Sequence, residues 1–341
     1  MIFSYSFPRA TIINNVVITR LFVIILACIS LYVIIITDLN YTDRSQYTQH
    51  FYQSMNMTTF DQLKYSNMEE LYVIIVNFIS YFVSSPILFY MILHIIFLVF
   101  ISTGIYKLQG IYLLAYSLII YLNVFYYYGY VLNGIRQGLA MAGLILVFSL
   151  LVKGKNNKGL MIAIITSLLH YSAIPFIFLT YLVVFLKNNL KFKYLLVSYF
   201  IFSILYIFDL QTLFVGFIDS GYFETYTSPE VMERFEKTNN INFLLFNSVF
   251  LIVFYIFYKK HFTQDDIYIL LFKLYIVFSM IFLLFGYIAF SNRLAAYSWF
   301  LIPILLAYYL VNNRLNHLNG LILVIILIVG IFTGVYNYFE I

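Results

Sequence analysis

Long apolar runs constrain this chain more than any other feature of its sequence. Short polar segments separate stretches that are long enough to cross a bilayer as α-helices. The runs cover residues 14–37, 86–106, 110–128, 134–152, 194–216, 241–258, 267–290, 294–311 and 319–338. In hydrocarbon each backbone amide needs a partner within the protein, so these runs predict helices.

The composition agrees with lipid as the main solvent. Of 341 residues, 63% are hydrophobic and only 10% are charged, whereas soluble domains carry about 25% charged residues. The sequence therefore predicts an all-α, polytopic integral membrane bundle that forms a single domain over residues 1–341. The net charge of +5 is too small and too dispersed to indicate nucleic-acid binding. The single cysteine, Cys28, excludes an intrachain disulfide and a cysteine-based metal site.

Two segments need a further argument. Residues 71–85 form a shorter apolar stretch, which favours an interfacial or re-entrant helix. Segment 159–186 fits either one long tilted helix or two short passes that meet near His170. Lysines flank it on both sides, at Lys153, Lys155, Lys158, Lys187, Lys191 and Lys193. The positive-inside rule places both lysine clusters in the cytoplasm, so we expect two passes with His170 near the outer face.

The same rule gives the predicted topology. We expect about eleven crossings, within a range of ten to twelve, and a cytoplasmic N-terminus. External loops are expected at about 38–70 and 217–240. An additional crossing at 71–85 would reverse the side of the N-terminus.

Three ionisable residues remain near the predicted outer helix ends, namely Arg136, His170 and Arg293. A charge at membrane depth costs about 2.5–3.5 kcal/mol, so such residues usually face a bundle interior or a water-filled cavity. The spacing of Asn133, Arg136, Gln137 and Ala140 is that of one helix face. Glycines at 134 and 138 would let a neighbouring helix approach closely. The alternative is that Arg136 extends to the interface as a snorkelling side chain.

The other two residues also allow two interpretations. Arg293 lies one helical turn before Tyr297, and its guanidinium could bind phosphate oxygens or simply contact lipid headgroups. His170 with the nearby hydroxyl of Ser172 could serve as a general base, since histidine titrates near neutral pH. The alternative for His170 is a hydrogen-bonded structural residue.

These motifs resemble a known family. Arg136-Gln137 followed by Ala140, and then His170-x-Ser172, resembles the EpsG family of Wzy-type polysaccharide polymerases. The family's external acidic and aromatic pattern and its late arginine have counterparts at Asp43, Tyr47, Glu69, Glu70, Leu71, Arg293 and Tyr297. The likeness covers most of the chain, although the 217–240 segment is short beside the external loop of many such polymerases.

The resemblance implies a glycosyltransferase of the bacterial cytoplasmic membrane with an outward-facing active site. It would transfer a growing glycan from undecaprenyl pyrophosphate to the non-reducing end of a new lipid-linked repeat unit. Arg136 and Arg293 would bind the pyrophosphates, and His170 would position the acceptor or act as its base. The sugars would be oriented by Asn133, Gln137, Ser172 and Tyr297.

Asp43, Glu69 and Glu70 are alternative bases or solvated loop charges. The expected partners are the lipid-linked oligosaccharide, the bilayer, a chain-length regulator and a flippase. We expect no cofactor and no metal.

Two other classes of membrane protein remain open. An O-acyltransferase acting on surface glycans would also use histidine and arginine, but it would need ionisable residues on the cytoplasmic side to receive an acyl group. A lipid-linked sugar flippase or a transporter would show inverted repeats, broken helix pairs and charges at the membrane midplane.

Overall fold

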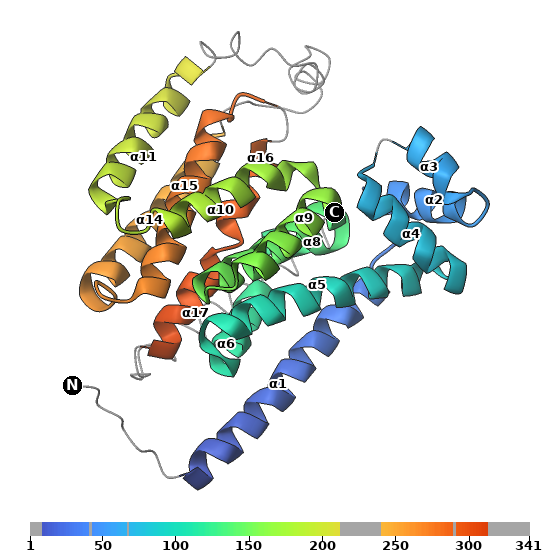
Figure 1. The fold of residues 1–341 in the computed structure, drawn as a ribbon, viewed down its shortest axis with the longest axis horizontal. Helices are drawn as coiled ribbons and strands as arrows, with labels where there is room; N and C mark the ends of the chain where they lie inside the picture. The colour runs from blue at the N-terminus through green and yellow to red at the C-terminus, as the bar shows by residue number, and fades with distance from the viewer. Residues whose placement is uncertain (1–8, 41–42, 67, 212–239, 289–290, 313–341) are drawn as a thin grey trace. The chain divides into compact units, whose positions relative to one another are not determined.

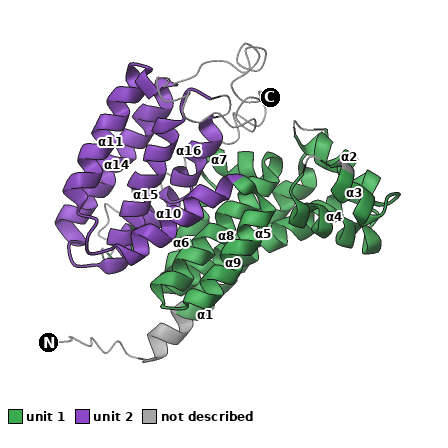
Figure 2. Ribbon diagram, turned by 45° about the horizontal axis from the view of Figure 1, so that its top comes forward, with its two compact units in different colours: residues 1–171, 310–341 green, residues 172–309 purple. Residues whose placement is uncertain are grey.

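The computed structural model describes residues 9–40, 43–66, 68–211, 240–288 and 291–312 (Figure 1). Within these ranges all regular secondary structure is helical and there is no strand, so the predicted all-α class is confirmed. The chain separates into two compact units, coloured in Figure 2. Unit 1 comprises residues 1–171 and 310–341, and unit 2 comprises residues 172–309. The expectation of a single membrane domain stays a prediction.

Unit 1 is built around α8 (Ile135–Val152), whose side chains are almost all buried. This helix packs between α5 (Pro86–Gln109) and α9 (Asn156–Leu169). Small residues allow the close approach. A Cβ at Gly104 of α5 would lie 2.9 Å from the backbone nitrogen of Leu146, and one at Gly143 would collide with Oγ1 of Thr166 in α9. The apolar helices α1 (Arg9–Ile36) and α6 (Ile111–Tyr121) pack against each other and against α5.

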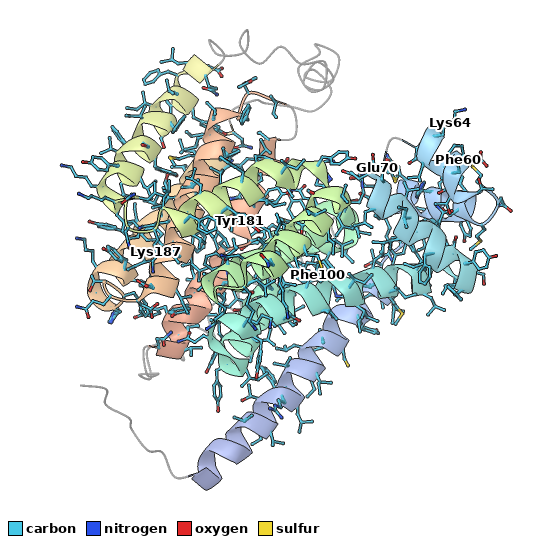
Figure 3. All side chains as sticks on the ribbon, viewed as in Figure 1. Phe60, Lys64, Glu70, Phe100, Tyr181 and Lys187 are labelled. Atoms are coloured by element: carbon cyan, nitrogen blue, oxygen red, sulfur yellow. The ribbon has the colours of Figure 1, made fainter. Side chains whose placement is uncertain are left out.

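Unit 1 also contains three short helices between α1 and α5. They are α2 (Arg44–Ser54), α3 (Thr59–Tyr65) and α4 (Glu70–Phe82). The 38–70 segment was expected to be a loop, but much of it is helical, because α2 buries Tyr47, His50 and Phe51 on one face. The side chains of Phe60 and Lys64 lie on the outer side of α3 (Figure 3). The second expected loop, 217–240, lies outside the described residues except for Asn240.

Unit 2 is centred on α15 (Asp266–Leu284), which contacts α10 (Ile174–Phe185), α11 (Phe192–Ile207), α14 (Ile241–His261) and α16 (Ser291–Trp299). A buried amide links three of these helices. The Oδ1 of Asn247 in α14 accepts hydrogen bonds from Tyr275, Ser298 and Trp299, each at 3.2 Å. Such polar contacts hold helices together where the surroundings offer no water.

Six described helices are long and apolar enough to cross a membrane. They are Val16–Ile36, Pro86–Gln109, Ile135–Val152, Ile241–His261, Asp266–Leu284 and Ser291–Asn312, the last of which includes α17 (Ile302–Asn312). A seventh is possible if α6 and the segment Tyr126–Asn133, which are bent by 94°, count as one span. The protein is therefore a multi-pass membrane protein, whereas a count of about eleven is not confirmed. The 319–338 run lies outside the described residues, and α4, α10 and α11 are shorter apolar helices.

The break predicted within 159–186 is confirmed. Helix α9 ends at Leu169, a 3₁₀ turn covers Tyr171–Ala173, and α10 begins at Ile174. Pro175 occupies the first turn of α10, where its missing N–H leaves no hydrogen bond unmade. The sides of the membrane on which these helices begin and end stay predictions.

Candidate active site

Glu69 joins Arg136 and His170 into one cluster in unit 1. Its Oε2 pairs with Nη1 of Arg136, and its Oε1 lies 2.6 Å from Nδ1 of His170. The carboxyl group is buried, with a side-chain exposure of 9%. Each side chain comes from the end of a different helix, because Glu69 precedes α4, Arg136 lies in the first turn of α8 and His170 follows α9.

The cluster keeps the Glu69 carboxyl group ionised. Burial raises its pKa, but the hydrogen bond and charge of His170 and the charge of Arg136 outweigh burial and lower the pKa to about 2. An ionised carboxylate can only accept hydrogen bonds, so Nδ1 of His170 must carry the proton. When the ring is neutral, Nε2 then presents its lone pair, and this atom makes no hydrogen bond with the described residues.

Two tyrosine rings lie beside the guanidinium group of Arg136. The guanidinium carbon lies 5.7 Å from the ring centre of Tyr47 and 5.8 Å from that of Tyr72. Nε also donates to the hydroxyl of Tyr47 at 3.4 Å. Nη1 is bound to Glu69, while Nη2 has no partner among the described residues. Arg136 is therefore held inside the unit, unlike a snorkelling side chain, and retains a donor for a ligand.

Asn133 does not share the helix face of Arg136, so that part of the prediction is wrong. Asn133 ends a π-helical turn, Gly129–Asn133, and Gly134 has ψ of 50°, which breaks the helix before α8. A Cβ at Gly138 would collide with the carbonyl oxygen of Tyr130, so this turn folds back closely on α8. Oδ1 of Asn133 accepts a hydrogen bond from the backbone N–H of Asp43 at 2.7 Å, while Gln137 is buried in α8.

The acidic residues of the expected external segment have different surroundings. Glu69 is buried and paired, so it is not a solvated loop charge. Glu70 is exposed at the start of α4 (Figure 3) and accepts a hydrogen bond from the hydroxyl of Tyr171. Asp43 contributes its backbone N–H to the contact with Asn133.

Unit 2 brings together two of the other predicted residues. The hydroxyls of Ser172 and Tyr297 lie 3.0 Å apart, and the ring of Tyr297 stacks on Phe176 with centroids 3.8 Å apart. Arg293 is half-buried in the first turn of α16, four residues before Tyr297. The described geometry therefore supports two separate groups of site residues, one in each unit.

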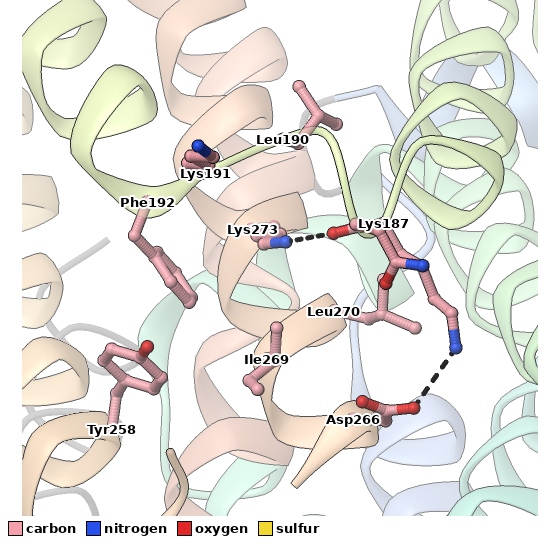
Figure 4. Close-up of a pocket in the computed structure, with 10 residues that line it drawn as sticks. Lys187, Leu190, Lys191, Phe192, Tyr258, Asp266, Ile269, Leu270 and Lys273 are labelled. Atoms are coloured by element: carbon pink, nitrogen blue, oxygen red, sulfur yellow. Dashed lines mark hydrogen bonds and ion pairs between the residues drawn. The ribbon is translucent and has the colours of Figure 1, made fainter. Parts of the chain in front are cut away.

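A lysine-lined cavity of about 360 Å³ also lies in unit 2 (Figure 4). Lys273 of α15 donates to the carbonyl oxygen of Lys187 at 2.6 Å, and Lys187 pairs with Asp266 at 3.2 Å. These contacts attach the α10–α11 connection to α15. None of the predicted site residues lines this cavity, so we do not assign it to the candidate active site.

Among the described residues, no three His, Cys, Asp or Glu side chains are grouped so that they could hold a metal ion. Metal independence stays a prediction.

The sequence analysis did not identify Tyr72 and His50, whose rings stack with centroids 6.1 Å apart beside Arg136. For His50 the available signal was the spacing of buried positions in residues 44–54, which is that of one helix face.

Comparison with known proteins gives one result. Residues 21–341, which are nearly the whole chain, match the EpsG family. Searches of curated proteins and of solved structures found no match. The family match agrees with the apolar helices and with the arginine and histidine motifs that suggested it. The chain therefore belongs to the EpsG family of polysaccharide-polymerase-like membrane proteins.

Proposed function

We propose that the protein polymerises lipid-linked oligosaccharide repeat units. The growing glycan is transferred from undecaprenyl pyrophosphate to the non-reducing end of a new lipid-linked repeat unit, at the outer face of the bacterial cytoplasmic membrane. The bridge that Glu69 forms between Arg136 and His170 is the observation that carries the proposal. It provides a positioned base and a cationic donor within one cluster.

The bond changes assign a task to each group. A bond forms between the acceptor hydroxyl oxygen and the anomeric carbon of the donor, while the bond from that carbon to the pyrophosphate oxygen breaks. Nε2 of His170 takes the hydroxyl proton, and the ionised Glu69 stabilises the imidazolium through Nδ1. Nη2 of Arg136 donates to the pyrophosphate as negative charge develops on it.

Glu69 is a positioning residue rather than the base. A carboxylate with a pKa of about 2 is a weak proton acceptor, and both of its oxygens already accept hydrogen bonds. These observations support His170 as the general base in the proposed reaction.

The remaining roles extend the proposal from the family motifs. Arg293 supplies a second contact to pyrophosphate, and Gln137, Ser172 and Tyr297 orient the sugars. Asn133 also orients the sugars, and Asp43, whose backbone N–H donates to Asn133 Oδ1, belongs to the same proposed substrate-binding group. The lipid-linked substrate enters from the bilayer, and a flippase and a chain-length regulator are the proposed protein partners.

Deletion of the chain from its cell tests the function directly. We expect single repeat units to accumulate on the lipid carrier and the ladder of longer polymers to disappear. An unchanged ladder in the deletion strain would contradict the proposal.

Purified protein supplied with these lipid-linked units should form polymer. Acylated sugar as the product would indicate an acyltransferase, and movement of the lipid-linked units across the membrane without new bonds would indicate a flippase.

A further inference from the structure

A cavity of about 400 Å³ lies in unit 1 between α2, α3 and the segment that precedes α4. Its lining residues are Gln46, Gln49, His50, Gln53, Met57, Gln62, Ser66 and Met68. Three of the glutamines, at positions 46, 49 and 53, lie on one side of α2 because they are three and four residues apart. Their side chains make no hydrogen bond with the described residues, so their amides are available to a ligand.

Two buried side chains of this cavity have unsatisfied polar atoms. His50 is 6% exposed, and neither of its ring nitrogens has a hydrogen-bond partner within the described part of the chain. Gln62 is 3% exposed, and its Nε2 lacks a partner although its Oε1 accepts from Ser54 at 3.0 Å and from Asn77 at 2.8 Å. A buried polar group without a partner is unfavourable, and such groups are usually satisfied by water or a ligand.

The chemistry of the lining indicates a neutral, hydroxyl-rich ligand. None of the described residues that line the cavity is Asp, Glu, Lys or Arg. Burial, followed by the charge of Arg136, lowers the pKa of His50 and so favours its neutral form. Glutamine amides and a neutral imidazole both donate and accept hydrogen bonds, as sugar hydroxyls do. Met57 and Met68 supply apolar surface for the C–H groups of a sugar ring.

The cavity also adjoins the candidate active site within unit 1. The ring of His50 stacks on Tyr72, and the ring of Tyr72 also contacts Tyr47 and the guanidinium of Arg136. Met68 directly precedes Glu69 in the chain. A sugar bound in this cavity would therefore lie next to the groups that carry out transfer.

We propose that this cavity is a subsite for an uncharged hexose or N-acetylhexosamine residue of the repeat unit. The inference rests on the proposed polymerase function, and it adds the class of sugar and the residues that select it. An acidic sugar would find no cation among the described lining residues to pair with its carboxylate, so the subsite discriminates against uronic acids.

Saturation-transfer NMR on the full-length protein in detergent tests the subsite without requiring turnover. The probes are glucose, galactose, N-acetylglucosamine, N-acetylgalactosamine and glucuronic acid. We expect transfer to at least one uncharged sugar and an apparent affinity about tenfold lower in the double variant Gln49→Ala/Gln53→Ala. Both residues are exposed in α2, and alanine favours a helix, so this variant should fold.

Asn56→Ala is the matched control, because Asn56 carries an exposed amide just after α2 but does not line this cavity. It should leave sugar binding unchanged. Absence of transfer to every uncharged sugar, equal binding by the double variant, or preference for glucuronic acid would each overturn the subsite.

Turnover separates this inference from the function on which it rests. In a polymerisation assay the double variant should raise KM for the lipid-linked unit about tenfold with kcat unchanged, since the contacts are made equally before and during reaction. Sugar binding that depends on the glutamines, in a protein that forms no polymer, would refute the polymerase and retain the subsite. Polymer formation with an unchanged KM would refute the subsite alone.

Discussion

At the scale of single residues, the planar guanidinium of Arg136 is the feature that another cation cannot replace. It contacts Glu69, Tyr47 and Tyr72 together and keeps Nη2 available. We predict that Arg136→Lys lowers polymerisation by roughly a hundred- to a thousandfold, the usual effect of losing one donor to developing charge. Polymer synthesis by the purified protein measures the effect. Arg20→Lys, at an exposed position of α1, is the control. Activity near that of wild type in folded Arg136→Lys would remove Arg136 from the proposed site.

The Glu69–His170 pair predicts coupled kinetic effects. His170→Ala should lower kcat with little change in KM, because a base acts mainly in the transition state. Glu69→Gln should also lower kcat, since a neutral amide stabilises an imidazolium less well than a carboxylate does. The double variant should lose less kcat than the product of the two single losses, because Glu69 acts partly through the histidine and partly through Arg136. Losses that multiply fully would show that Glu69 does not act through His170.

The lowered pKa of Glu69 also predicts the response of stability to acid. Its contribution is complete above the ordinary pKa of 4.5 and is lost as pH falls through the folded value of about 2. The shift corresponds to at most about 3 kcal/mol. We therefore expect the melting temperature in detergent to fall between about pH 4.5 and pH 2.

Melting curves of Glu69→Gln over the same pH range provide the check. This variant should be less stable than wild type at neutral pH and should lose less stability on acidification. Asp61→Asn, at a half-buried position of α3, should keep the wild-type acid response. Equal acid sensitivity of Glu69→Gln and wild type would show that Glu69 does not determine the response.

At the scale of helices, the entrance to α8 depends on backbone contact with the preceding turn. A side chain at Gly138 would collide with the carbonyl oxygen of Tyr130, and a backbone atom cannot move aside cheaply. We predict that Gly138→Ala destabilises the protein by about 1–3 kcal/mol, as overpacking usually does. Detergent melting measures this, with Gly129→Ala as the control because a Cβ there meets nothing within 4 Å. Equal stability of the two variants would contradict the close packing.

At the scale of the whole molecule, the lysine pattern makes a topology prediction. Cysteines introduced at positions 156, 189 and 313 in a Cys28→Ser background should resist an impermeant reagent added from outside. Cysteines at positions 56 and 228 should react with it. Labelling of intact cells measures the pattern. Reaction at 189 from outside would contradict the double crossing of 159–186 and move His170 away from the outer face.

The sequence by itself determined the class of the protein and the identity of its unusual residues. The apolar runs are long and contain few charged residues. They therefore predict membrane helices, because hydrocarbon permits few other backbone structures. The break near His170 is also visible in the sequence, since Pro175 and the flanking lysines mark it. The motifs around Arg136 and His170 indicated the family that the comparison then confirmed.

Only the tertiary structure decided how these residues act together. Glu69 is separated from Arg136 by 67 residues and from His170 by 101, so no local period reveals that one carboxylate binds both. The position of Asn133 depended on a π-helical turn and the break at Gly134, which its spacing from Arg136 does not show. Hydrophobic periodicity reports which face of a helix is buried, whereas charge pairing depends on which helix ends meet in space.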